Sequence, residues 1–158
     1  VSQLLSNVAL QILRQEHMVV SACLSQKSFE NDDVAAERAF NRISVQERSK
    51  FDRETVNKFG GQMDMRYTNE STPPDSNSSS TMAIVTLSMC VSGRFDKDIR
   101  KVSTRQQLHE ALSTIASTMN TPGDRLMAGE VLWAPEERSD VLVNRDVDAR
   151  YPDLVPLV

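Results

Sequence analysis

Residues 124–135 read Asp-Arg-Leu-Met-Ala-Gly-Glu-Val-Leu-Trp-Ala-Pro, and this stretch decides the fold. Its largely apolar run has the character of a strand, and it carries the only tryptophan of the chain, Trp133. Pro135 has no N–H to donate to a strand ladder, so the pairing must end there. We therefore expect a strand that closes a structural unit built from the residues before it.

The preceding segments predict a strand and a helix. Alternate residues from Ala83 to Val91 are all apolar, which is typical of a central strand. From Ser103 onward apolar residues recur at helical spacing, and Asn120-Thr-Pro-Gly123 ends that helix. A strand, a helix and a strand in this order predict two parallel strands joined by a right-handed crossover.

The N-terminal part predicts another helix and another strand. Residues 2–15 repeat apolar side chains on one face of a helix, and residues 18–25 alternate as a strand does. A second helix is expected to follow the capping residues 31–33. Ser44 and Glu47 have the spacing of a capping box, which predicts that a third helix begins at Ser44.

The length and the polar segments define the domain. A chain of 158 residues suits a single domain spanning residues 1–158. The Gly60-Gly61 pair should end the third helix, and residues 60–81 are rich in Ser, Pro and Asn, which predicts a flexible insert. A short helix is expected near Asn144. The fold class is α+β: a two-layer α/β domain with a small sheet of about three strands and four to five helices packed on it.

Composition disfavours several classes of protein. Aromatic residues make up 5% of the chain and the net charge is -4, so nucleic-acid binding is not expected. Cys23 and Cys90 lie in apolar runs and predict free thiols without a disulfide framework. No apolar run is long enough to cross a bilayer. Because the chain begins at Val1 rather than Met, we expect a processed product or a fragment.

Catalytic and metal-binding patterns are missing from the sequence. His17 and His109 have no second ligand at metal-binding spacing, and no nucleophile elbow, phosphate loop or zinc-protease helix occurs. We therefore predict no catalytic residue, no metal, no cofactor and no enzyme activity. Glu130 interrupts the apolar strand and could act as an acid or base, but we favour a structural role, in which its side chain reaches an edge of the sheet or pairs with an arginine such as Arg94 or Arg125.

A basic segment precedes the helix that starts near Ser103. Arg94, Arg100, Lys101 and Arg105 are candidates for contact with an anion at this helix N-terminus. A solvated charged loop explains the same composition, and the segment lacks the glycines that close backbone approach to a phosphate needs.

An aromatic residue and a proline-containing tail are candidates for contact with a protein partner. The residues are Trp133, Tyr151, Pro152 and Leu154. The alternative is that Trp133 packs under the last helix.

Three runs of the chain resemble a known family. They are residues 40–55, residues 125–135 and the segment Arg150-Tyr-Pro-Asp-Leu154. In this order they look like the thylakoid-associated domain family of cyanobacteria, algae and plants that includes the chloroplast fluctuating-light-acclimation protein. The similarity covers nearly the whole chain, apart from the Ser-rich insert.

The resemblance implies a cellular setting. It implies a plastid domain in the stroma, held at the thylakoid or envelope membrane by segments outside this chain. It also implies a non-enzymatic accessory or regulatory role: docking on protein subunits of a photosynthetic membrane complex, and tuning energy dissipation or the proton gradient. The family has no established catalytic residues to carry over. The alternative is an anion- or small-ligand-sensing domain, or a cryptic enzyme, that uses residues 94–105.

Overall fold

The computed structural model describes residues 1–64, 82–93, 101–121, 125–135 and 142–158, with the backbone alone for 51–64. These residues form four α-helices, a short 3-10 helix and two antiparallel sheets of two strands each. The elements in chain order are α1 (Ser2–Arg14), η1 (Glu16–Met18), β1 (Ser21–Ala22), α2 (Asp33–Asp64), β2 (Ile84–Val91), α3 (Arg105–Asn120), β3 (Leu126–Ala134), α4 (Asn144–Arg150) and β4 (Val155–Pro156). The expected α+β class is confirmed.

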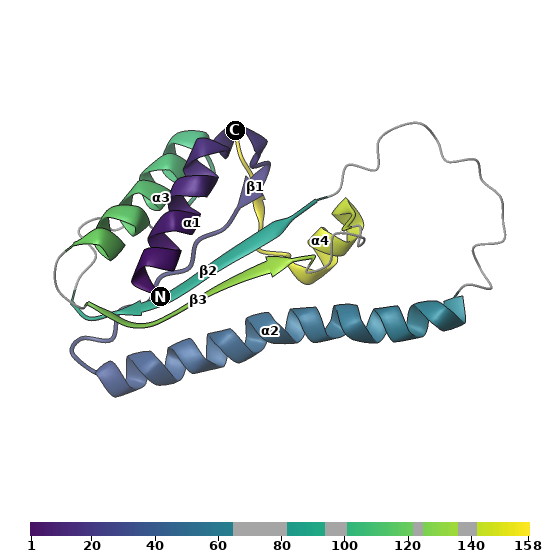
Figure 1. Ribbon diagram of the computed structural model, residues 1–158, viewed down its shortest axis with the longest axis horizontal. Helices are drawn as coiled ribbons and strands as arrows, with labels where there is room; N and C mark the ends of the chain where they lie inside the picture. Colours follow the sequence, from purple (N-terminus) through teal and green to yellow (C-terminus); the bar gives the residue numbers. More distant parts are fainter. Residues whose placement is uncertain (65–81, 94–100, 122–124, 136–141) are drawn as a thin grey trace.

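Helices lie on both faces of the β2–β3 sheet. Figure 1 shows α1 and α3 side by side on one side of the sheet, and α2 running along the other. α2 packs against both strands, while α1 packs against α3 and β3. The sheet is therefore the layer that joins the α1–α3 pair to α2.

The two strands of this sheet are antiparallel, so the expected parallel crossover is wrong. Val91 pairs with Leu126, which means that β3 begins beside the end of β2. α3 starts far from that point, beside the C-terminus, where Arg105 N–H donates to Val158 O at 3.4 Å. It then carries the chain back to the end of β2 (Figure 1). A parallel pair would need a helix that returns the chain to the start of the first strand.

α2 is one continuous helix, so the predicted helix boundary at Ser44 is wrong. The Ser44 hydroxyl donates to Glu130 Oε2 at 2.6 Å, and the Glu47 carboxylate accepts from Lys50 Nζ at 2.7 Å. The capping pattern is local, whereas this serine is used in a tertiary contact. α2 also continues through Gly60-Gly61 to Asp64, and residues 65–81 of the expected insert lie outside the described residues.

The strand expected at residues 18–25 is much shorter in the structure. Only Ser21 and Ala22 form β1, and they pair with β4 rather than with β2. Leu157 N–H donates to Val20 O at 3.0 Å beside this pair. The alternating residues therefore bind the C-terminal tail instead of extending the main sheet.

The helix expected after Ser103 is confirmed, with its cap one residue later. The Thr104 side chain accepts from Gln107 N–H at 3.2 Å, and Gln107 Oε1 accepts from Ser103 N–H at 2.9 Å. The first bond satisfies a backbone donor in the first turn of α3, and the second satisfies the N–H of the residue before the cap, so the arrangement resembles a capping box.

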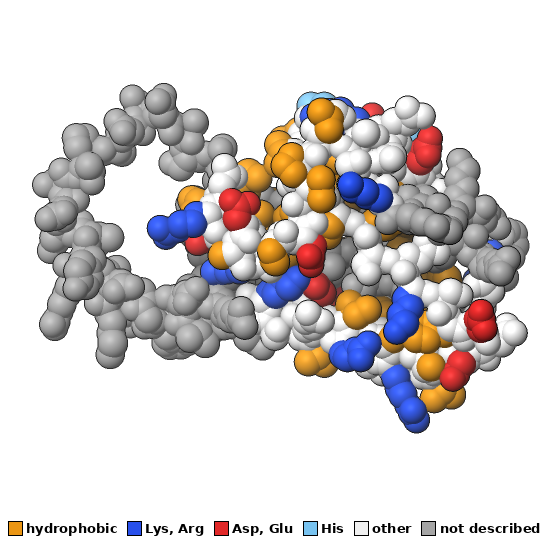
Figure 2. Space-filling view, turned by 180° about the vertical axis from the view of Figure 1, so that it is seen from behind, with side chains coloured by type: hydrophobic (Ala, Val, Ile, Leu, Met, Phe, Trp, Pro, Cys, Tyr) orange, Lys and Arg blue, Asp and Glu red, His pale blue; other side chains and the backbone are white. Residues whose placement is uncertain are grey.

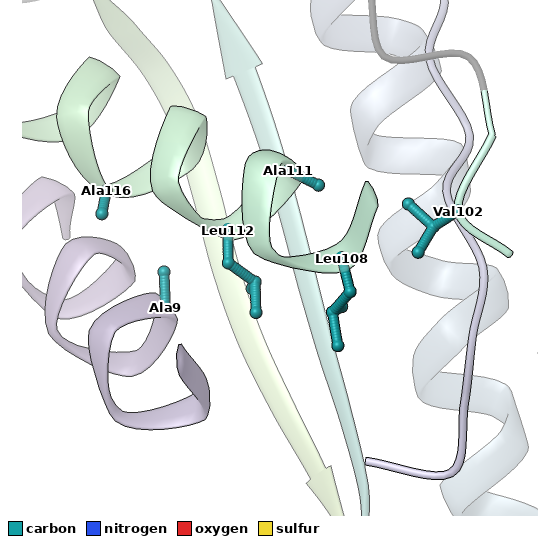
Figure 3. Packing of buried hydrophobic residues seen from close by; sticks show 6 residues of the cluster. All are labelled: Ala9, Val102, Leu108, Ala111, Leu112 and Ala116. Carbon is teal, nitrogen blue, oxygen red and sulfur yellow. The ribbon is translucent and has the colours of Figure 1, made fainter. Parts of the chain in front are cut away.

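The larger core lies between α1, α3 and the sheet. In Figure 3, Ala9 of α1 and Ala116 of α3 point toward each other, while Leu108 and Leu112 point from α3 toward the strands. The small alanine side chains allow the two helices to pack closely. A second cluster joins β2 to the C-terminal region through Ile84, Leu142, Val147 and Tyr151.

Candidate functional site

Trp133 lies at the surface near the end of β3. Its exposed fraction is 57%, and that of its cross-strand partner Val85 is 44%. Directly paired residues lie on the same face of a sheet, so these two side chains form one apolar area, here called the Trp133 surface. The indole is in solvent rather than packed under α4. Its neighbour Ala134, the last residue of β3, is buried.

The tail residues have different positions. Tyr151 is buried in the second core cluster, and Lys50 Nζ lies 4.5 Å from the centroid of its ring, a cation–π contact between α2 and the tail. Leu154 packs at the margin of that cluster, while Pro152 is exposed. The structure thus brings Tyr151 and Leu154 together in the core and leaves Pro152 and Trp133 at the surface.

Glu130 forms an ion pair, although not with either arginine that we expected. Its Oε1 atom accepts from Arg48 Nε at 2.5 Å and forms a salt bridge with the same guanidinium, and its Oε2 atom accepts from Ser44. The side chain of Glu130 is 9% exposed and that of Arg48 is 66% exposed. Both carboxylate oxygens are occupied, so this contact holds α2 to β3.

Sequence reasoning missed Ser44 and Arg48 as partners of Glu130. The available signal was their spacing of four residues, which places both side chains on one face of a helix. The predicted helix boundary concealed that signal, because it made Ser44 a capping residue at the start of a helix rather than a residue on the same helical face as Arg48.

The basic segment gives only part of the predicted anion site. Arg94 and Arg100 lie outside the described residues, and Lys101 is exposed. Arg105 Nη1 donates to Glu16 O at 2.9 Å and to Val19 O at 3.4 Å, so this guanidinium fastens η1 to the start of α3. On the face in Figure 2, Lys and Arg side chains are interspersed with Asp and Glu. The anion-binding alternative stays a prediction.

The histidines lie near the surface. His17 is exposed in η1, and His109 Nδ1 lies 2.9 Å from Glu16 Oε2. Within the described ranges, His, Cys, Asp and Glu form no group of three or more that could hold a metal ion. None of the described helices is both long and apolar enough to span a membrane.

Both cysteines are free, with Cys23 exposed and Cys90 buried. Burial raises the pKa of the Cys90 thiol above its ordinary value, and the carboxylates of Glu37 and Asp33 raise it further. The folded state therefore holds this proton more tightly than the unfolded state does. The stabilisation is complete well below the ordinary pKa of a thiol and is lost as the pH rises through the folded-state pKa.

This linkage predicts that the free energy of unfolding falls with rising pH in the alkaline range. Urea denaturation at a series of pH values should show a shallower decline for Cys90→Ala than for the unsubstituted chain, because the other titrating groups are common to both. Equal slopes would contradict the assigned role of Cys90.

Comparison with known proteins places the chain in a family. The profile described as "Protein of unknown function (DUF1517)" matches residues 1–157. The chain belongs to this family. The family expected from the three similar runs of sequence is thereby confirmed.

Two curated relatives of this DUF1517 domain are informative. "Protein FLAP1 homolog A" of Synechocystis sp. is 32% identical over 125 residues, which cover 76% of this chain and 36% of the relative. "FLUCTUATING-LIGHT-ACCLIMATION protein 1, chloroplastic" of Arabidopsis thaliana is 30% identical over 156 residues, covering 99% and 38% respectively. The chain thus spans well under half the length of these relatives. No solved structure matches it.

Proposed function

We propose that this domain is a non-enzymatic accessory or regulatory part of a plastid membrane protein. It docks on protein subunits of a photosynthetic complex and tunes energy dissipation or the proton gradient. One observation carries the proposal: 99% of the chain aligns with a relative named for acclimation to fluctuating light and described as chloroplastic. We place the domain in the stroma, beside the thylakoid or envelope membrane, with membrane attachment through segments outside this chain.

The chemistry of the described side chains supports a role in contact rather than in reaction. Glu130 is held by Arg48 and Ser44, and His109 is paired with Glu16. These contacts join α2 to β3 and η1 to α3, so each has a structural role in the fold.

Exposed apolar side chains offer surfaces for docking. Val34 and Val45 of α2 are both exposed, and their separation of eleven residues places them on the same outward face of the helix. Trp133 and Pro152 are exposed elsewhere on the molecule. A partner protein that buries such residues gains the free energy of removing apolar area from water.

The proposal predicts a defect that depends on how the light is given. In a photosynthetic host, a truncated protein, in which the residues that correspond to 1–158 are deleted from the full-length protein, should reach its membrane but fail to support normal acclimation. Chlorophyll fluorescence quenching should differ from that of the intact strain under fluctuating light and match it under steady light.

Co-purification provides the second readout. The tagged full-length protein, extracted gently from native membranes, should retain photosynthetic subunits that the truncated protein loses. The truncated protein must accumulate to the same level for the comparison to hold. Normal quenching in its strain, together with unchanged recovery of subunits, would contradict the proposed function.

A further inference from the structure

The outer edge of β3 carries unused hydrogen-bonding groups. β3 pairs with β2 on one side only, and no hydrogen bond joins its other side to any segment that the structure describes. An edge of this kind is a template for another strand, and folded proteins commonly protect it with charged side chains or prolines. The only charged residue of β3 is Glu130, and Arg48 and Ser44 already hold its carboxylate against α2.

The phase of the ladder identifies the outward groups. Ser92 N–H donates to Arg125 O at 2.8 Å, and β3 contains one additional residue between Leu126 and Ala128. From Ala128 onward the backbone N–H and C=O groups of successive residues point alternately toward β2 and away from it. Ala128, Glu130, Leu132 and Ala134 therefore bond to β2. The residues between them direct their N–H and C=O groups outward: Gly129, Val131 and Trp133.

Apolar side chains of the first turn of α1 lie beside this edge. A Cβ atom placed on Gly129 would lie 2.6 Å from Leu5 Cδ1 and 3.1 Å from Val1 Cγ1, so the first turn of α1 covers this glycine. Leu4, in the same turn, is 52% exposed. Ser6 of α1 bonds to Ala116 and Asn120 of α3, which places Leu4 on the opposite side of the helix, away from α3.

We propose that a second copy of this chain pairs with this edge, antiparallel and centred on Val131. This register places Trp133 of each copy opposite Gly129 of the other. Leu5 and Val1 of the same copy already fill the space above Gly129, so each indole lies beside the first turn of the other copy's α1 and removes the exposed Val1 and Leu4 from water. All three outward residues of each copy form hydrogen-bonded pairs in this register.

The arrangement satisfies the requirements of a twofold dimer. The same surface serves both copies, as an isologous contact demands. In this register Glu130 of each copy lies across from Leu132 of the other copy. The two Glu130 carboxylates therefore do not lie directly opposite each other. Pairing joins two sheets of two strands into one sheet of four. The outward face of α2 and Pro152 stay available to other proteins, so the dimer does not depend on the proposed docking.

The single tryptophan makes this dimer measurable in the purified chain. Sedimentation equilibrium should show a shift from dimer to monomer mass on dilution, and the fluorescence emission of Trp133 should move to longer wavelength over the same concentrations. Trp133→Lys should remain monomeric throughout, with an unchanged circular dichroism spectrum. The matched control is Val45→Lys, at an α2 residue that is 69% exposed, which should dimerise normally.

Crosslinking tests the register independently of Trp133. Hydrogen-bonded antiparallel pairs have Cα atoms about 5.5 Å apart, a separation that a disulfide can bridge. In a Cys23→Ser background, Val131→Cys should form a covalent dimer on mild oxidation, whereas Val45→Cys should not. A protein that is monomeric at every concentration would overturn the proposal. It would also be overturned by a dimer that persists in the Trp133→Lys variant and that is not covalently linked in the Val131→Cys variant.

Discussion

Leu5→Ala should lower the free energy of unfolding by about 2–5 kcal/mol, the range found when a large buried aliphatic side chain is truncated. Leu5 is fully buried, and its Cδ1 atom occupies the space above Gly129. Removing it leaves a cavity between α1 and β3 that Gly129 cannot fill, because glycine has no side chain. Urea denaturation followed by circular dichroism measures the effect.

The adjacent residue supplies the control. Leu4 lies in the same helical turn and is largely exposed, so Leu4→Ala should change the free energy of unfolding by no more than about 0.5 kcal/mol. Equal losses for the two variants would show that α1 does not pack on β3 through Leu5.

Glu130→Ala should cost about 1–3 kcal/mol, because it leaves the Ser44 hydroxyl and the Arg48 guanidinium without their acceptor. The lower part of that range is favoured, since Arg48 is largely exposed and water replaces part of what it loses. Glu130→Gln should cost less, because its side-chain oxygen can still accept one hydrogen bond. Thermal and urea unfolding measure both variants.

A double-mutant cycle assigns this cost to the contact between α2 and β3. Arg48→Ala and Glu130→Ala should be less than additive when combined, since each removes the same ion pair. Glu37→Gln, at an exposed carboxylate of the same helix, serves as the control and should have little effect. Strict additivity would show that the two residues do not stabilise each other.

The elements with strong local patterns were predictable from the sequence. The apolar stripe of α3 and the alternating residues of β2 belong to their own segments, and both elements form where they were expected. The direction of pairing was not predictable, because it depends on where α3 begins in space. Nothing near Arg105 in the sequence shows that this residue lies beside Val158.

The partners of Glu130 show the same limit. A polar residue inside an apolar strand indicated a buried contact, and that inference was correct. The identity of the partner depended on whether Ser44 starts a helix or lies within one, and the local pattern fits both arrangements. The exposure of Trp133 was likewise undecided by sequence, since it depends on where α4 packs.

The uninterrupted course of α2 has a mechanical consequence. At 32 residues it is roughly 48 Å long, and Figure 1 shows its C-terminal half projecting beyond the end of the sheet. Ser44 and Arg48, whose side chains bond to Glu130, lie near the middle of this helix, so a force on its C-terminal end acts about these contacts. Through the same contacts such a force bears on β3, the strand that carries Trp133.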